Sequence, residues 1–341
     1  MKFVLLRSGQ FLRWLVYCHC AAVVTFVFIV HPGVDGYRRA MFGEMVDGTA
    51  HRPHVYRTLV PTGIRLLSSV TPDSLKERLI GLVKDTRLFS KLGWDVERIP
   101  EYVIATLVFF ACFLGFAFAL HNLVPIFYPE PTAARELGPI IGLIVLPVFF
   151  RYYNHVYDPA TLFLFTACIF FLLNRSLVKY YLFFILMAIN KETAILLVLV
   201  FSMWYWQKGK PIIPVAIHVC IQTILFLSIR AIIALGFANN PGGFMEDHLL
   251  YNIYLIVKPG AVLYIALVFA VFGYLVVNQW SLKPIFLRRG FVAVFVPLFA
   301  LTLFFGNLDE PRIFYESFPF VFLLSLPTIM DALGIRIVIP T

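Results

Sequence analysis

The chain has 341 residues, of which 60% are hydrophobic and only 14% are charged. Charged residues make up about 25% of an average soluble domain, and apolar runs near 20 residues recur here. The composition therefore excludes a globular domain surrounded by water and predicts an all-α, polytopic membrane protein. The net charge of +9 fits basic cytoplasmic loops that face membrane lipids, and we expect no binding of nucleic acid.

Hydrophobic runs, taken in chain order, predict about ten membrane spans in a helical bundle. The first run, residues 11–30, is longer than the apolar region of a usual signal peptide and lacks a small-residue cleavage pattern, so we expect a retained anchor. The runs 137–151, 179–190 and 192–207 are short or closely abutted, and predict tilted, broken or re-entrant helices. The other runs are 101–123, 157–174, 212–236, 260–279, 290–306 and 317–334.

A long polar block, residues 31–100, follows the first run. Apolar residues at helical spacing predict helices over 35–46, 58–70 and 74–92, and the last two are amphipathic. Amphipathic helices lie along a membrane interface or pack against the bundle, and the sequence leaves both open. We expect one domain, residues 1–341, with this block as its first outer loop.

The distribution of Lys and Arg predicts the orientation of the chain, because short cytoplasmic loops carry an excess of basic residues. With a cytoplasmic N-terminus, the outer short loops are mainly acidic and both termini lie inside. We therefore expect a multi-pass protein of the cell (inner) membrane whose polar block faces outward. The inner loops then carry Arg175, Lys179, Lys208, Lys210, Lys283, Arg288, Arg289 and Arg336.

No metal or other cofactor is predicted. All five cysteines lie in hydrophobic runs, so we expect neither a disulfide framework nor a structural metal. His155 and Asp158 are three residues apart and can share a helix face, but a divalent cation would need a further carboxylate.

Four polar clusters that are far apart in the sequence come out on the same side of the predicted bundle: residues 35–57, 153–158, 190–192 and 307–312. Ionisable groups at a membrane boundary are costly unless they are hydrated, paired or functional. We therefore expect these clusters to form one site at the outer interface.

Three side chains have the most specific chemistry. Asp35 can act as a general base toward a hydroxyl or amine, or it can cap the start of a helix. Arg57 can clamp a phosphate with paired N–H groups or bind lipid headgroups. Arg312 directly flanks a span and has acidic neighbours, so it is the cation we expect to face a lipid phosphate.

The remaining candidates allow two interpretations each. His54 is a proton carrier or a structural donor. Lys191 and Glu192 form a functional pair or a tight turn between two helices. The substrate-binding set that we expect consists of Tyr37, His54, Arg57, His155, Asp158, Lys191, Glu192, Glu310 and Arg312.

The chain resembles GT-C-type integral membrane glycosyltransferases, which use polyprenyl-phosphate-linked sugars. The resemblance rests on VDGYRRAMFGEMVDG and HVYRTLVPTGIRLL in the first outer loop, on Tyr157-Asp158-Pro159 at the start of a span, and on DEPRIFYESFPFVFLL near the end. It covers most of the chain.

The resemblance implies inverting transfer of a sugar from a polyprenyl-phosphate donor to a lipid-linked or glycan acceptor on the non-cytoplasmic face, as in glycan biosynthesis. The family's first-loop acidic base maps onto Asp35. Because Gly36 follows where many members have a second acid, Asp47 and Glu44 are alternative bases. Arg312 would stabilise the departing phosphate, assisted by Lys191 or Arg57.

Two other activities remain open. A lipid-linked glycan polymerase or ligase would share the outer-face chemistry. A transporter or flippase of lipids or sugars would need an ionisable group within the bilayer, and Arg230 is the main candidate for one.

Overall fold

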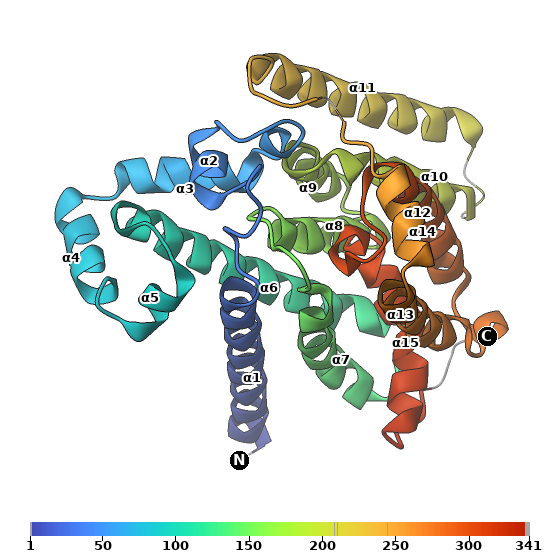
Figure 1. Ribbon diagram of the computed structural model, residues 1–341. Coiled ribbons are helices and arrows are strands. Elements are labelled where there is room, and N and C mark those ends of the chain that lie inside the picture. Colours follow the sequence, from blue (N-terminus) through green and yellow to red (C-terminus); the bar gives the residue numbers. More distant parts are fainter. Residues whose placement is uncertain (1, 208, 210, 244, 338–341) are drawn as a thin grey trace.

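The computed structural model describes residues 2–207, 209, 211–243 and 245–337. Within these residues the chain is all-α, with fifteen α-helices joined by loops and short 3₁₀ turns, and it contains no strand. Lys208 and Lys210, which entered the prediction of orientation, lie outside the described residues. Figure 1 shows α8 inside the bundle, with α3, α4 and α5 forming an arm on the side away from α13, α14 and α15.

Six helices of the described chain are long and apolar enough to cross a membrane, which makes this an integral multi-pass membrane protein by length and composition. They are α1 (Lys2–Val30), α6 (Ile99–Phe127), α7 (Thr132–Val145) with the 3₁₀ turn η3 (Leu146–Phe149), α11 (Ile212–Gly236), α13 (Pro259–Val277) and α14 (Ile285–Phe305).

Every predicted span is helical, but four of them are shorter than a full crossing. These are α8 (Asp158–Leu173), α9 (Leu177–Asn190), α10 (Leu196–Gln207) and α15 (Phe318–Ala332). At 1.5 Å per residue such helices reach roughly 25 Å or less, against a hydrocarbon core of about 30 Å. The run 137–151, predicted to be short, instead belongs to an 18-residue apolar helical segment that starts at Thr132.

The polar block contains α2 (Phe42–Asp47), η1 (His54–Tyr56), α3 (Leu59–Val70), α4 (Asp73–Val83), α5 (Arg87–Leu92) and η2 (Val96–Arg98). The prediction of a helix over 58–70 is confirmed. The helix expected from residue 35 begins only at Phe42, because the Asp35 carboxylate accepts the hydrogen bond of the Phe42 N–H group and fixes the first turn there.

The single helix predicted over 74–92 is wrong, because a turn divides it into α4 and α5. The Thr86 hydroxyl accepts from the Phe89 N–H group and starts a new helix, as N-capping threonines do. α4 buries none of its residues, whereas α3 buries Val60, Pro61 and Ile64. α3 is thus packed on the protein, whereas α4 contacts α6 without fully burying any residue, so that part of its apolar face remains exposed and suits a membrane interface.

The core lies around α8, which packs against α6 and α9. Most of its side chains are buried, as expected for a helix that is apolar on all sides. Tyr157 directly precedes α8 and Asp158 is its first residue. The packing of α8 therefore places two polar side chains in the interior, where they are fully buried. This end of α8 is where the polar clusters meet.

Candidate functional site

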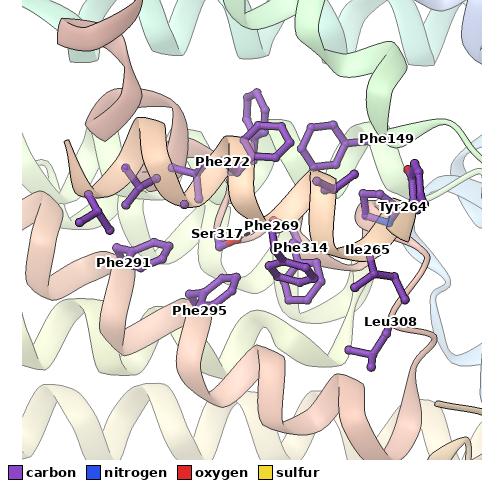
Figure 2. A pocket seen from close by; sticks show the side chains of 17 residues that line it. Phe149, Tyr264, Ile265, Phe269, Phe272, Phe291, Phe295, Leu308, Phe314 and Ser317 are labelled. Carbon is purple, nitrogen blue, oxygen red and sulfur yellow. Dashed lines mark hydrogen bonds between the residues drawn. The ribbon is translucent and has the colours of Figure 1, made fainter. Parts of the chain in front are cut away.

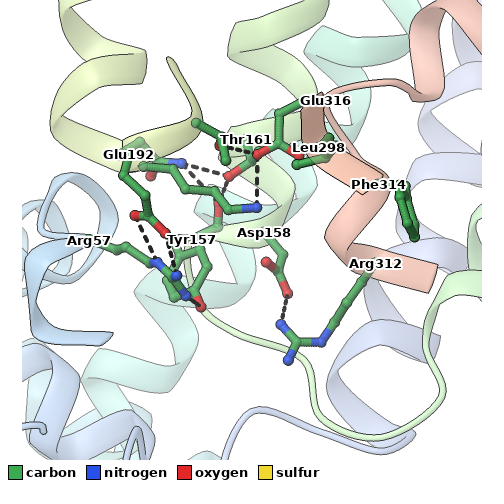
Figure 3. A network of polar contacts seen from close by, with 12 residues as sticks. Arg57, Tyr157, Asp158, Thr161, Glu192, Leu298, Arg312, Phe314 and Glu316 are labelled. Carbon is green, nitrogen blue, oxygen red and sulfur yellow. Dashed lines mark hydrogen bonds and ion pairs between the residues drawn. The ribbon is translucent and has the colours of Figure 1, made fainter. Parts of the chain in front are cut away.

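Three polar clusters that are remote in sequence meet at the start of α8. They come from the segment around η1, from η4 (Glu192–Ile195) and from η6 (Pro311–Phe314). Figure 3 shows Arg57, Glu192, Tyr157, Asp158, Arg312 and Glu316 converging from these elements. We call the ion-paired residues of this region the polar network.

Glu192 ties the first loop to the helical bundle. The Arg57 guanidinium binds its carboxylate with both ends, at 2.5 Å from Nη2 to Oε1 and 3.2 Å from Nε to Oε2. Arg57 also donates to the Tyr157 hydroxyl, and Arg230 lies 3.8 Å from Glu192. Arg57 therefore holds Glu192 in a bidentate ion pair, and a guanidinium can bind a phosphate with the same geometry.

Arg312 is held between two carboxylates. Its Nη2 atom is 2.9 Å from Glu310 Oε2, and its Nη1 atom is 3.4 Å from Asp158 Oδ2. Asn307 donates to the other Glu310 oxygen at 2.9 Å. The Nε atom of Arg312 is buried without a hydrogen-bond partner, so this guanidinium keeps one donor that the protein does not use.

Lys191 and Glu192 point to different partners and do not pair with each other. Lys191 Nζ lies 2.8 Å from Glu316 Oε1, with side-chain exposures of 8% and 0%, and the Thr193 hydroxyl donates to the same oxygen. Asn190 Nδ2 donates to Tyr157 O and Thr161 Oγ1. The turn between α9 and α10 thus links the polar network to α15.

An aromatic cluster covers the network on the side of the first loop. The rings of Tyr37, His54 and His155 lie 5.1 to 6.0 Å apart, and His155 stacks on Tyr157. Both ring nitrogens of His54 are buried without a hydrogen-bond partner. Burial, together with the positive charges of Arg57 and Arg312, lowers the pKa of His54 to about 3.

His155 is neutral for related reasons. Burial lowers its pKa well below the usual range, and Arg312 and His54 add to the effect. Its side chain faces the aromatic cluster, while its backbone N–H donates to Asp158 Oδ2 at 3.0 Å. Among the residues that the structure describes, no three potential metal ligands come together.

No hydrogen bond or ion pair among the described residues joins Asp35 to the polar network. Its Oδ1 atom accepts from the Phe42 N–H group at 2.9 Å, and its Oδ2 atom accepts from the Tyr102 hydroxyl at 2.6 Å. Asp35 is not the N-cap of a helix, because α2 begins at Phe42 with Met41 as its N-cap, and its role as a base stays a prediction. Two residues on, the Tyr37 ring reaches the aromatic cluster and its hydroxyl lies 3.4 Å from Glu246.

The alternative bases also lie outside the network. Asp47 forms an ion pair with Arg98 at 2.5 Å, and Glu44 lies on α2 with its Oε2 atom buried and unpaired. Sequence reasoning did not place Glu316 or Thr193 in the site, and it included Tyr157 only as a member of the cluster 153–158, without a role of its own. The one signal in the sequence was the position of Glu316, which lies four residues after Arg312 and two residues before the apolar helix α15.

The network balances its charges and yet leaves polar atoms unpaired. Four cations (Arg57, Lys191, Arg230, Arg312) face four carboxylates (Asp158, Glu192, Glu310, Glu316). In the network, Arg312 Nε and Glu316 Oε2 are buried without a hydrogen-bond partner, and so are both His54 nitrogens and Asp309 Oδ1 beside it. Each such atom costs about 1–3 kcal/mol, so their concentration in one place indicates a site for a polar ligand.

An apolar groove lies on the other side of η6 (Figure 2). Pro311 and Phe314 of this turn line the groove, whereas Arg312 between them belongs to the network. The polar network and the apolar groove therefore lie on opposite sides of η6.

Comparisons with known proteins give no relative: no protein-family model, no curated protein and no solved structure matches this chain.

Proposed function

We propose that this protein is a membrane glycosyltransferase that moves a sugar from a polyprenyl-phosphate donor to a lipid-linked or glycan acceptor. One observation carries the proposal: a charge-balanced network, buried except for the partly exposed Glu192, lies at the ends of apolar helices, with unpaired donors and acceptors in it and beside it. A phospho-sugar offers both hydroxyl groups and anionic oxygens, which complement the free atoms of Arg312, His54, Glu316 and Asp309.

In this proposal Arg312 stabilises the phosphate that leaves the anomeric carbon. Its two Nη atoms are oriented by Asp158 and Glu310, and its Nε atom is unpaired. A fixed cation in a water-poor site needs no reorganisation when charge develops, which is the main source of electrostatic catalysis. Arg57 and Lys191 are held by their own carboxylates and assist from the edge of the network.

Asp35 is the proposed base that accepts the proton of the acceptor hydroxyl. Each of its oxygens already accepts one hydrogen bond, which holds the carboxylate in one orientation, and a carboxylate oxygen has capacity for a further donor. We further propose that the four shorter helices belong to a bundle of about ten membrane segments, with the network on the non-cytoplasmic side.

The position of Arg230 does not favour the transporter alternative. Its guanidinium donates to the Tyr56 carbonyl at 3.0 Å and approaches Glu192 at 3.8 Å. It lies six residues before the end of α11, and is therefore part of the same network rather than an isolated charge at the middle of a span. A lipid-linked glycan polymerase or ligase shares the proposed chemistry.

The test is sugar transfer by purified protein from a polyprenyl-phospho-sugar. We expect Arg312→Gln to lower kcat by about 10²-fold or more, because it removes a fixed cation from the transition state. Arg289→Gln, an exposed arginine of α14, is the matched control and retains wild-type activity. Equal effects of the two substitutions would contradict the assignment of the site.

The same assay separates a catalytic from a structural Asp35. Asp35→Asn removes the base but keeps an acceptor for Phe42, whereas Tyr102→Phe removes only the 2.6 Å hydrogen bond to Asp35. We expect transfer to be lost in Asp35→Asn and largely retained in Tyr102→Phe. Matching activities in the two variants would leave Asp35 with its structural role alone.

A further inference from the structure

A second polar cluster lies at the end of the bundle that is remote from the polar network. Its members come from α1, α6 and α7: Arg13, Tyr17, His121, Arg135 and Glu136. We call these residues the inner cluster. From Arg13 to Val30, the last residue of α1, the helix rises about 25 Å, so the inner cluster lies near one membrane face and the first outer loop near the other. The Lys and Arg distribution predicts that the face of the inner cluster is cytoplasmic.

Hydrogen bonds within the inner cluster orient Arg135. Its Nε–H group donates to His121 Nε2 at 3.1 Å, and because a guanidinium only donates, this imidazole nitrogen accepts. The ring is therefore neutral, with its proton on Nδ1, which lies 3.1 Å from the Tyr17 hydroxyl. That hydroxyl in turn donates to the Glu136 carbonyl at 3.1 Å. Tyr17 and His121 are 0% and 5% exposed, so buried polar groups hold the Arg135 side chain in place.

Arg135 keeps donors that the protein does not use. Within the described part of the chain, neither of its Nη groups has a hydrogen-bond partner, and no carboxylate pairs with it. The residue is half-buried, so these donors can reach a ligand.

The neighbouring Arg13 leaves the inner cluster with a surplus of positive charge. Arg13 pairs with Glu136, at 2.5 Å between Nη1 and Oε1, and its Nε atom is buried without a hydrogen-bond partner. Two guanidinium groups thus face one carboxylate, which leaves one positive charge without a counter-ion. Ionisable groups within membrane spans are costly unless they are hydrated, paired or functional, so this surplus indicates a site for an anion.

The surroundings of the inner cluster favour a lipid over a soluble anion. Arg13 and Arg135 each lie three residues inside the end of a candidate membrane span. Trp14 stacks on Phe118 at 5.7 Å between ring centres, and the two residues are 37% and 48% exposed. An exposed Trp near the end of a span is typical of the headgroup level of a membrane. A ligand with a charged head and an apolar chain therefore matches both the free donors and the exposed rings.

We propose that Arg13 and Arg135 form a binding site for the phosphodiester head of an anionic phospholipid, with an acyl chain along Trp14 and Phe118. A monoanionic phosphodiester balances the surplus charge, and its oxygens match the paired N–H groups of a guanidinium. Basic pockets between membrane helices on the cytoplasmic side are known to bind anionic headgroups. The site is separate from the proposed sugar transfer and does not depend on it.

Native mass spectrometry of the purified full-length protein in detergent tests the site by counting bound lipids. We expect Arg135→Gln to weaken binding of the first dioleoyl phosphatidylglycerol about 10-fold or more, as for the loss of a hydrogen bond to a charged group. Arg135→Lys should retain part of the affinity. Arg289→Gln, at an exposed arginine of α14 that is expected on the same membrane face, is the matched control and should bind this lipid as the wild type does.

Dioleoyl phosphatidylcholine tests the dependence on charge, because its choline group makes the head zwitterionic. We expect it to bind the wild type more weakly than phosphatidylglycerol does, and to bind Arg135→Gln as it binds the wild type. Inorganic phosphate distinguishes a lipid head from a free anion. Since it has no acyl chain to contact Trp14 and Phe118, it should not displace phosphatidylglycerol.

A further pair of variants tests the positioning of Arg135. Tyr17→Phe removes the hydroxyl that joins His121 to the Glu136 carbonyl, and should weaken phosphatidylglycerol binding less than Arg135→Gln does. Tyr180→Phe likewise removes a fully buried hydroxyl, one that contacts Leu197 and Gln222, and should leave lipid binding unchanged. The thermal unfolding midpoint without added lipid shows that each variant is folded. Added phosphatidylglycerol should raise this midpoint in the wild type more than in Arg135→Gln.

Four results would overturn the proposal. Unchanged phosphatidylglycerol binding in Arg135→Gln would remove the site, and an equal loss in Arg289→Gln would reduce it to general attraction between charges. Equal affinity of the wild type for phosphatidylcholine would remove the preference for an anionic head. Displacement of phosphatidylglycerol by inorganic phosphate would assign the site to a soluble anion instead of a lipid.

Discussion

His54 lies in surroundings that hold its imidazole neutral. Apolar and aromatic neighbours remove it from water, and Arg57 and Arg312 add positive charge nearby, so its pKa falls to about 3. The same environment leaves both ring nitrogens unpaired. A neutral imidazole with a free donor and a free acceptor is suited to a sugar hydroxyl, which can fill both roles.

The lowered pKa predicts that stability falls in acid. Unfolded His54 takes up a proton below its usual pKa near 6.5, whereas folded His54 resists protonation down to about 3. Its contribution is therefore complete above pH 6.5 and is lost as the pH falls from 6.5 toward 3, by at most about 1.4 kcal/mol per pH unit.

Thermal unfolding between pH 7.5 and 4.5 measures this effect. We expect His54→Phe, which keeps a ring in the aromatic cluster, to lose less stability in acid than the wild type. Part of the slope remains, because His155 contributes in the same direction. His51→Phe serves as the control, and parallel pH profiles of His54→Phe and the wild type would count against the role of His54.

At the scale of elements, glycines allow close packing between the apolar helices. A Cβ atom on Gly290 of α14 would come within 2.2 Å of the Phe320 ring of α15, and one on Gly115 of α6 within 2.7 Å of Phe163 of α8. Small residues let membrane helices approach closely, where packing rather than the hydrophobic effect holds them together.

This packing predicts a position-dependent effect of adding one methyl group. Gly290→Ala must displace a buried ring and its helix, and we expect a loss of stability of about 1–3 kcal/mol, as for other overpacked interiors. Gly260→Ala meets no neighbour and should be neutral or slightly stabilising. Unfolding midpoints in detergent compare the two, and similar midpoints would show that α14 and α15 are not in close contact.

At the scale of the whole molecule, the polar network and the arm of the first loop belong to the same side of the bundle, since Arg57 of that loop binds Glu192. The Lys and Arg distribution predicts that this side is non-cytoplasmic. The proposed chemistry therefore depends on the orientation of the whole chain as well as on local geometry.

Cysteine labelling tests this orientation. In a background without the native cysteines, Asp85→Cys between α4 and α5 should react with an impermeant maleimide in intact cells. Arg289→Cys at the start of α14 should react only after permeabilisation; both native residues are exposed. The opposite pattern would place the polar network on the cytoplasmic side.

The sequence by itself determined the class of protein and located the ten apolar runs that form helices, because apolar runs and helical periodicity are properties of neighbouring residues. It did not reveal α12 (Leu249–Val257), nor the turn within 74–92, which depends on one capping hydroxyl. Only the tertiary structure decided that Arg57 pairs with Glu192, 135 residues away, and Arg312 with Asp158, 154 residues away. Such partners depend on how helices pack, and the same packing left Asp35 beside Tyr102 rather than within the network.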